Sequence, residues 1–225
     1  MTQVGVCLAG CGFLDGAEIR ESVLTLLALS RAGAQAVCFA PDRDQMHVVD
    51  HLRGEPVEGE SRNVLVESAR IARGEIVALS GFDLSSVDAL IFPGGYGVAK
   101  NLCDFAVSGP DCTVVPEVQE LIQSARVAEL PMGFVCIAPA LAAAALRGSG
   151  ESLELTIGHD AGTAEALAAM GAQHTARGAN QAHLDRVHRV ASTPAYMLDA
   201  PLHEIAQGIE QMVQDLLSLV PSHAA

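Results

Sequence analysis

A cysteine stands at the junction between an apolar segment and a run of small residues. Residues 132–140 read MGFVCIAPA, so Cys136 follows a predicted strand and precedes a predicted helix. Such a strand–turn–helix elbow presents the nucleophile of many hydrolases. Free N–H groups at a helix start favour a thiolate, which predicts a lowered pKa and a nucleophilic Cys136. A buried structural cysteine is the alternative interpretation.

A glycine-rich segment follows another predicted strand. Residues 92–102 read FPGGYGVAKNL, and glycine lets a backbone approach a ligand closely. Ligands bind at the carboxyl ends of strands in open α/β sheets, so the N–H of Gly95 is expected to face the same crevice as Cys136. There it could bind an oxyanion. A tight turn with positive φ is the alternative explanation of these glycines.

Two glutamates lie near the start of a helix predicted over residues 17–32. Glu18 and Glu21 are three positions apart, which makes them neighbours on one helical face. Either carboxyl group could act as general acid and base beside a thiolate. A solvated first turn is the alternative, with Asp15 as the predicted N-cap. The same helix carries a stripe of apolar residues that includes Ile19, Val23 and Leu27.

Strands and helices alternate along the chain. The predicted strands are residues 3–9, 34–40, 87–92, 131–135, 153–157 and 187–192. The further predicted helices are residues 64–72, 115–128, 137–146, 161–170 and 202–220. This order predicts an α/β three-layer sandwich with a mostly parallel central sheet and helices on both faces. No linker or repeat interrupts it, so we expect a single domain over residues 1–225, with polar residues 42–62 as an excursion at the sheet edge.

Composition narrows the function classes. Apolar residues make up 50 % of the chain and charged residues 18 %, which is enough to build a buried core. Asp and Glu number 27 against 13 Lys and Arg, a net charge of −14 that disfavours nucleic acid and anionic membranes as partners. The apolar runs are too short to span a bilayer, and the first residues lack a secretory n-region. We therefore expect a cytoplasmic protein.

Metal, disulfide and dinucleotide sites are not expected. The six cysteines include no CxxC pair, and without a secretory signal they predict free thiols and no metal centre. The glycines of residues 10–16 do not form GxGxxG, which disfavours a dinucleotide site. Most histidines lie in polar surroundings. His159 differs, because it follows the predicted strand over residues 153–157 and would lie at a strand's carboxyl end.

Several segments together resemble a known family. They are GCGFLDGAEIRESVLTLLALSRAGAQAVCFAPD, ARIARGEI, FPGGYGVAKNL, GFVCIAPA, LTIGHD, AGTAEAL and STPAYM. They are similar to the PfpI-type cysteine superfamily, which contains protein deglycases and glutathione-independent glyoxalases, and within it to the ElbB branch, described as glyoxalases or as isoprenoid-biosynthesis proteins with an amidotransferase-like domain. The similarity spans residues 4–220 and implies a flavodoxin-like, class I glutamine amidotransferase-like fold.

The resemblance implies roles for individual residues. Cys136 matches the nucleophile, and Glu21 matches the superfamily glutamate, with Glu18 as the fallback. Gly95, beside Gly94 in the PGG turn, and Ile137 match the oxyanion hole. The deglycases also use an arginine and a histidine, which correspond to Arg62 in Ser-Arg-Asn and to His159 in Gly-His.

The resemblance further implies an activity. It implies a cofactor-independent enzyme that converts glyoxal, or a related reactive dicarbonyl, to the hydroxy acid through a cysteine hemithioacetal, and that forms a homodimer. Class I amidotransferases need a His-x-Glu pair downstream of the cysteine, and none follows Cys136, which disfavours glutamine hydrolysis. The alternatives are a thiol-based redox sensor and an accessory or partner-binding protein linked to isoprenoid biosynthesis.

Overall fold

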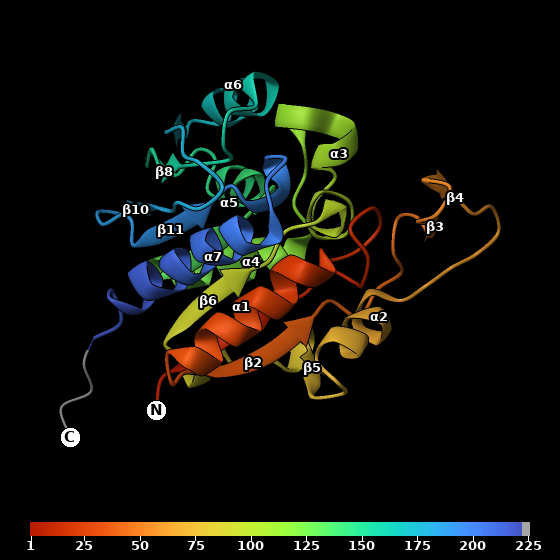
Figure 1. The fold of residues 1–225 in the computed structure, drawn as a ribbon, viewed down its shortest axis with the longest axis horizontal. Helices are drawn as coiled ribbons and strands as arrows, with labels where there is room; N and C mark the ends of the chain where they lie inside the picture. The colour runs from red at the N-terminus through yellow and green to blue at the C-terminus, as the bar shows by residue number, and fades with distance from the viewer. Residues whose placement is uncertain (222–225) are drawn as a thin grey trace.

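The computed structural model describes residues 1–221, and residues 222–225 of the predicted domain lie outside this part. The described residues form a seven-stranded sheet in the order β10-β11-β7-β6-β1-β2-β5 (Figure 1). All neighbouring strands in it are parallel except β10, which runs antiparallel to β11 at one edge. The predicted mostly parallel sheet with helices on both faces is confirmed.

The elements follow the predicted alternation closely. The strands of the central sheet are β1 (Gln3–Cys7), β2 (Gln35–Ala40), β5 (Ile76–Ala78), β6 (Ala89–Phe92), β7 (Met132–Val135), β10 (His183–Asp185) and β11 (Val190–Thr193). The helices are α1 (Ile19–Arg31), α2 (Val64–Ile71), α3 (Phe105–Ser108), α4 (Pro116–Val127), α5 (Ala138–Ala145), α6 (Ala161–Ala169) and α7 (Leu202–Leu217).

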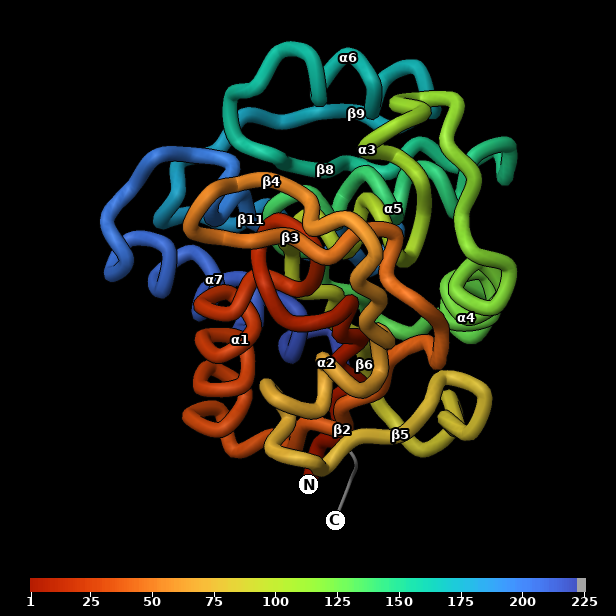
Figure 2. The backbone as a smooth tube through the Cα atoms, turned by 90° about the vertical axis from the view of Figure 1, so that its right-hand side faces the viewer, coloured from red at the N-terminus to blue at the C-terminus, as the bar shows by residue number. Residues whose placement is uncertain are grey.

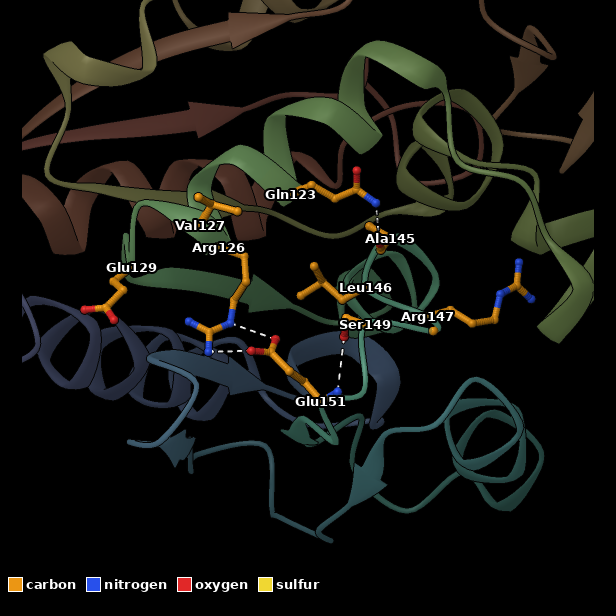
Figure 3. A pocket seen from close by; sticks show the side chains of 10 residues that line it. Gln123, Arg126, Val127, Glu129, Ala145, Leu146, Arg147, Ser149 and Glu151 are labelled. Atoms are coloured by element: carbon orange, nitrogen blue, oxygen red, sulfur yellow. Dashed lines mark hydrogen bonds and ion pairs between the residues drawn. The ribbon is translucent and has the colours of Figure 1, made fainter.

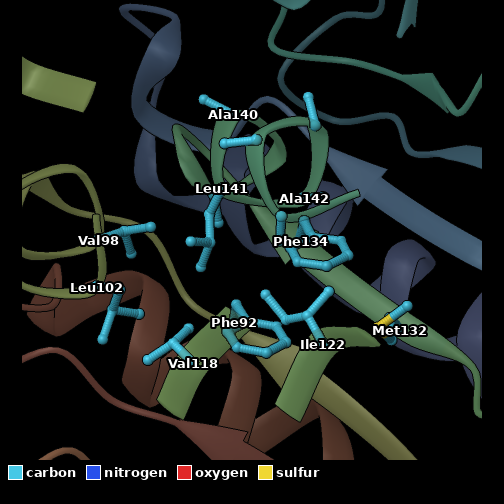
Figure 4. Packing of buried hydrophobic residues seen from close by; sticks show 14 of the residues in the cluster. Phe92, Val98, Leu102, Val118, Ile122, Met132, Phe134, Ala140, Leu141 and Ala142 are labelled. Atoms are coloured by element: carbon cyan, nitrogen blue, oxygen red, sulfur yellow. The ribbon is translucent and has the colours of Figure 1, made fainter. Parts of the chain in front are cut away.

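Two hydrophobic clusters cover the two faces of the sheet. Helices α1 and α7 pack on one face, and α4 and α5 cover the other, with the strands between them (Figure 2). On the α4–α5 side, Phe92 of β6 and Phe134 of β7 stack with ring centroids 5.0 Å apart (Figure 4). The strands that end at the glycine turn and at Cys136 are therefore buried on both faces and fixed against each other.

The predicted strand over residues 153–157 does not join the central sheet. Only Glu154–Leu155 forms a strand, β8, which pairs in parallel with β9 (Gln173–His174) in a separate two-stranded sheet. Two strands of the central sheet, β5 and β10, were missed because each has only three residues.

The apolar stripe of α1 faces outward. Its residues Ile19, Val23 and Leu27 are 46 %, 49 % and 42 % exposed. The buried residues of the helix are Glu21, Ser22, Thr25, Ala28 and Leu29, three of which are polar. The inner face of α1 therefore combines core packing with the polar Glu21.

The excursion after β2 packs against the loop that leads into α1. It contains a small hairpin of β3 (Val49–Asp50) and β4 (Glu55–Pro56). The backbone N–H of Val49 donates to Oδ2 of Asp15 across 2.8 Å. Asp15 is therefore buried and holds the excursion in place. The prediction that Asp15 caps α1 is wrong.

Candidate active site

Loops at the carboxyl ends of β1, β6, β7 and β11 meet at one place. The β1 loop leads to α1, and the β6 loop carries the glycine turn. The β7 strand runs directly into Cys136, and the β11 strand runs into the 3₁₀ helix Ala195–Met197. In an open α/β sheet this edge is where ligands bind.

Cys136 lies at the apex of a strained turn. Its φ of +61° lies in the left-handed region that residues other than glycine seldom adopt. Its N–H donates to the carbonyl of Thr193 in β11 across 2.9 Å, which fixes the turn to the sheet. The N–H groups of Gly95 and Ile137 act on the sulfur and lower the pKa of the thiol. The backbone therefore directs two N–H donors toward the thiol and toward any atom attached to it.

Glu21 projects from the buried face of α1 toward Cys136. Its side chain is completely buried. Oε1 accepts a hydrogen bond of 3.1 Å from the backbone N–H of Tyr196, whereas Oε2 is buried without a hydrogen-bond partner. Oε2 and Cβ of Cys136 approach the same face of Gly94, so the carboxyl group lies on the Cys136 side of α1. An acid beside a thiol, removed from water, can pass a proton to or from the reacting group.

Burial has the largest effect on the pKa values of Glu21 and Cys136. It raises the pKa of Glu21 to about 8, and the negative charge of Glu18 adds to this effect. Burial and the Glu21 charge raise the pKa of the Cys136 thiol well above its usual value, while the two N–H donors oppose this. The lowered pKa predicted from the helix start is therefore wrong. Desolvation outweighs the N–H groups, and at neutral pH Glu21 keeps its proton.

Glycine is required where the Cys136 elbow and the glycine turn after β6 are in contact. A Cβ on Gly94 would lie 2.3 Å from Cβ of Cys136 and 2.5 Å from Oε2 of Glu21. Gly97 makes an equally close approach, because a Cβ there would lie 2.4 Å from the carbonyl carbon of Gly16. The β6 turn and the loop before α1 thus lie backbone against backbone, and this contact presents the Gly95 N–H to the sulfur.

Glu18 is the N-cap of α1. Its Oε2 accepts the Glu21 N–H across 2.6 Å, and its own N–H donates to the Gly94 carbonyl across 2.8 Å. Burial raises the pKa of Glu18 from its ordinary value, and the capping N–H of Glu21 opposes the rise. Glu18 therefore lies beside the glycine turn, whereas the Glu21 carboxyl group lies on the Cys136 side.

A cavity of about 510 Å³ opens above Cys136. Its apolar lining consists of Phe13, Ala99, Phe105, Ala106, Ile137 and Met197. Its polar side chains are those of Glu18, Tyr96, Asp160, Thr163 and Tyr196. None of the lining residues in the described part of the chain is Lys, Arg or His.

Two residues of the predicted site lie elsewhere. The guanidinium of Arg62 pairs with Glu67 and Glu60, with nitrogen–oxygen distances of 3.7 and 3.8 Å, and does not line the cavity. His159 is exposed and also does not line the cavity, because the segment before it pairs with β9 instead of joining the central sheet. In residues 1–221, the cavity around Cys136 is therefore lined by neither residue.

Another hollow of about 570 Å³ lies at the ends of α4 and α5 (Figure 3). Arg126 and Glu151 form two hydrogen bonds of 2.7 and 2.8 Å across it, and Gln123 bonds to the Ala145 carbonyl. Its polar groups are engaged with one another, and no cysteine or histidine lines it. This hollow therefore offers no chemistry comparable with that around Cys136.

Sequence reasoning missed two residues that organise the site. Asn101 is buried in the π-helix Val98–Leu102, and its amide donates to the carbonyls of Ala9 and Asp15 and accepts from the N–H of Met46. Tyr196 holds Glu21 through its backbone N–H. Asn101 lies in FPGGYGVAKNL and Tyr196 lies in STPAYM, two of the motifs that resemble the family. The resemblance assigned no role to either residue.

The described residues contain no group of three or more His, Cys, Asp or Glu arranged to hold a metal ion. The helices of residues 1–221 are all too short or too polar to cross a membrane.

Curated relatives match nearly the whole chain, although no family model matches it. The rat "ES1 protein homolog, mitochondrial" is 49 % identical over 96 % of this chain and 84 % of its own length. The human "Glutamine amidotransferase-like class 1 domain-containing protein 3, mitochondrial" is 49 % identical over 96 % of this chain and 83 % of its own. The zebrafish ES1 protein is 36 % identical over 97 % of this chain and 86 % of its own.

Solved structures agree with the fold. The crystal structure of an isoprenoid biosynthesis protein with an amidotransferase-like domain from Ehrlichia chaffeensis superposes with a TM-score of 0.91 at 38 % identity, covering 97 % of this chain and 99 % of that one. A DJ-1 superfamily protein from Salmonella typhimurium superposes with a TM-score of 0.55 at 18 % identity, over 97 % of this chain and 88 % of that one. The second likeness shows the fold alone.

The fold and the elbow together define an amidotransferase-like α/β protein with a cysteine at the carboxyl end of a central strand. With these relatives, the chain belongs to the ES1 family of glutamine amidotransferase-like class 1 domain proteins. The cytoplasmic location predicted from the sequence is contradicted, because all three curated relatives are described as mitochondrial.

Proposed function

We propose that this protein is a glutathione-independent glyoxalase-type enzyme that acts on a reactive dicarbonyl through Cys136. The observation that carries the proposal is the close approach of Cys136 and the buried Glu21 carboxyl group at Gly94, beside the N–H groups of Gly95 and Ile137. This set supplies a nucleophile, a proton carrier and two oxyanion donors without a metal or an organic cofactor.

The first step forms a hemithioacetal. The Cys136 sulfur attacks one aldehyde carbon of glyoxal, a C–S bond forms, and the C=O electron pair moves to oxygen. The N–H groups of Gly95 and Ile137 bind that oxyanion. Glu21, which holds a proton at neutral pH, protonates it and becomes a carboxylate, and the thiol proton passes to water.

The second step moves hydrogen between the two carbons. The Glu21 carboxylate removes the C–H proton of the hemithioacetal carbon, which gives an enediolate, and returns that proton to the neighbouring carbon. The hydroxyl proton moves from the first oxygen to the second, and the product is a glycolyl thioester on Cys136. Water then attacks the thioester carbon, the C–S bond breaks, glycolate leaves with the thiol restored, and Glu21 regains a proton from water. The sum is glyoxal plus water to glycolate and a proton.

Glyoxal turnover without glutathione tests this proposal. Wild-type protein should produce glycolate, and Cys136→Ser, which keeps the size of the side chain, should lose the activity while retaining the fold by circular dichroism. Glycolate production at the wild-type rate by the folded Cys136→Ser variant would refute the assignment. Negligible turnover in both proteins would favour the non-enzymatic alternatives.

An accessory role in isoprenoid biosynthesis is a second candidate, favoured by the description of the Ehrlichia relative. The cavity itself argues against isoprenoid diphosphates as its ligand, because no Lys or Arg lines it in residues 1–221 and diphosphates are bound by such side chains. An accessory role would therefore depend on a partner protein. A redox-sensing role would use the same Cys136 thiol and stays the other alternative.

The chain is further proposed to form a homodimer. Support comes from the exposed apolar ridge of Ile19, Val23 and Leu27 on α1, since three such side chains in line on one helix face are typical of a surface that a partner covers.

A further inference from the structure

The cavity above Cys136 is much larger than glyoxal requires. Its volume of about 510 Å³ lies in the range of roughly 300–1,000 Å³ that accommodates larger organic ligands. Glyoxal is a single carbon–carbon bond with an oxygen on each carbon, so most of the cavity would still hold water. The extra space would accommodate a substituent attached to the reacting carbonyl.

Apolar side chains form a wall for such a substituent. Phe105 and Ala106 come from α3, Met197 follows β11, and Ile137 follows the nucleophile. They belong to three separate segments that converge on one space. An apolar group placed there would remove their surface and its own from water, which favours binding.

The charged side chains of the cavity have one sign. Glu18 lies beside the oxyanion donors, where its N–H bonds to the Gly94 carbonyl. Asp160 lies at the start of α6, and its Oδ1 caps the helix through the Thr163 N–H across 2.7 Å. Two carboxylates that line the same cavity repel an anionic substituent.

The nearby cations bind to residues around the cavity and do not line it. Arg20 donates to the Tyr196 hydroxyl across 3.2 Å, lies over its ring at 5.9 Å, and lowers the pKa of Glu18 through its charge. Lys100 donates to the Leu14 carbonyl across 2.8 Å and lies over the Tyr96 ring at 5.3 Å. Arg20 thus offsets part of the Glu18 charge from outside, while all charged side chains that line the cavity in residues 1–221 are carboxylates.

We propose that this site selects α-oxoaldehydes that carry a bulky apolar substituent, uncharged or cationic, and rejects those that carry an anion. The proposal rests on the proposed function, which supplies the reacting aldehyde. The chemistry is the same as for glyoxal. An α-oxoaldehyde R–CO–CHO takes up water and gives the hydroxy acid R–CH(OH)–COOH, with no external oxidant or reductant.

Turnover of a matched pair of substrates tests the selection. Phenylglyoxal, which yields mandelate, should show a kcat/KM at least ten-fold above that of glyoxal. Addition of a carboxylate to the same ring, in 4-carboxyphenylglyoxal, should lower kcat/KM about ten-fold. A preference for glyoxal, or equal rates for the two aromatic compounds, would overturn the proposal.

Alkylation of Cys136 tests the cavity without any turnover. Thiols displace iodide from iodoacetamide, its N-phenyl derivative and iodoacetate, and only the last is an anion. Rates at Cys136, measured by peptide mass spectrometry and divided by those of N-acetylcysteine, should be highest for the N-phenyl compound. They should be about ten-fold lower for iodoacetate than for iodoacetamide. Equal normalised rates for the two smaller reagents would exclude an anion-rejecting cavity.

Isosteric variants assign the effect to the two carboxylates. Glu18→Gln and Asp160→Asn keep the acceptor oxygens that cap α1 and α6, and each should reduce the iodoacetamide-to-iodoacetate ratio by about half or more. Glu75→Gln removes the same charge from an exposed position outside the cavity and should leave the ratio unchanged. An equal reduction in all three variants would mean that net charge, not the cavity, controls access.

The two assays separate this inference from the proposed function. Absence of glyoxal and phenylglyoxal turnover, with the alkylation ratios intact, would reject the glyoxalase chemistry and retain the selectivity of the cavity. Turnover of glyoxal with no discrimination in either assay would retain the enzyme and reject the selectivity.

Discussion

The backbone N–H of Tyr196 donates to Oε1 of Glu21 across 3.1 Å, although 175 residues separate them in the chain. Tyr196 follows Ala195, whose φ of +43° turns the chain at the end of β11 toward α1. The N–H fixes one carboxyl oxygen, which leaves the rest of the carboxyl group directed at Cys136. The orientation of the proton carrier thus depends on the main chain of a distant loop.

Glu21→Gln should abolish the proton transfer while the fold is kept. Glutamine retains an oxygen that can accept the Tyr196 N–H, but its amide neither donates a labile proton nor removes one from carbon. Glyoxal turnover should fall by about 10²–10⁴-fold, the usual contribution of general acid–base catalysis. Steady-state kinetics give the measurement. A loss below about ten-fold would point to Glu18 as the proton carrier.

The same substitution should change the pH dependence of stability. Glu21 has a pKa of about 8 in the folded protein against 4.5 for an ordinary glutamate, so the folded state holds this proton where the unfolded state has lost it. The stability that this proton provides is complete below about pH 4.5 and is lost as pH rises through 8, with a slope of about 1.4 kcal/mol per pH unit. Urea unfolding should show this decline in wild type and its absence in Glu21→Gln. Parallel curves for the two proteins would exclude a buried protonated Glu21.

Gly94→Ala should damage both stability and activity. The added Cβ would meet Cβ of Cys136 at 2.3 Å and Oε2 of Glu21 at 2.5 Å, and neither neighbour has space to move. We expect a loss of about 1–3 kcal/mol in unfolding free energy, as for overpacked cores, with turnover near zero. Gly81→Ala is the matched control, since no atom lies within 4 Å of its added Cβ. Similar unfolding midpoints for the two variants would contradict the close contact.

Arg62→Ala and His159→Ala should leave turnover within about two-fold of wild type. Neither side chain lines the cavity, and Arg62 instead pairs with Glu67 near the surface. Glu67 keeps its ion pair of 2.9 Å with Arg70 when Arg62 is removed, so the unfolding free energy should change little. A large drop in kcat for His159→Ala would show that the segment before α6 closes over Cys136 during the reaction.

The α1 ridge predicts a change in assembly state. Val23→Glu and Leu27→Glu place a charge on a surface that already faces solvent in the single chain, so the fold should remain intact. If the ridge is the homodimer contact, sedimentation should show wild-type dimers and variant monomers. Val77→Glu provides a control at a similarly exposed apolar residue on β5, at the far edge of the sheet. A monomeric wild type would refute the dimer.

The sequence predicted the sheet well, because buried strands depend on local patterns. Short apolar runs that end in Cys136 or in Pro-Gly-Gly mark buried strands and their carboxyl ends. Apolar periodicity does not mark the inner face of α1, because that face carries Glu21, Ser22 and Thr25 beside its apolar residues.

Other contacts were beyond sequence reasoning. The Tyr196 contact to Glu21 uses a backbone N–H, which every residue except proline has, so no side-chain type signals it. The position of His159 depended on whether residues 153–157 joined the central sheet, and strand pairing cannot be read from a single apolar run. The pKa of Cys136 depended on desolvation, and the sequence showed only the helix start.

The backbone contact between Gly16 and Gly97 constrains how this site can diversify. Substitutions there would separate the two loops and remove the Gly95 N–H from the sulfur, so selection has little freedom at the elbow. The walls contributed by α3 and by the start of α6 carry no such restriction, since their side chains face the cavity and not another backbone. New substrate ranges in related proteins should therefore arise by exchange of residues such as Phe105 and Asp160, around unchanged reaction machinery.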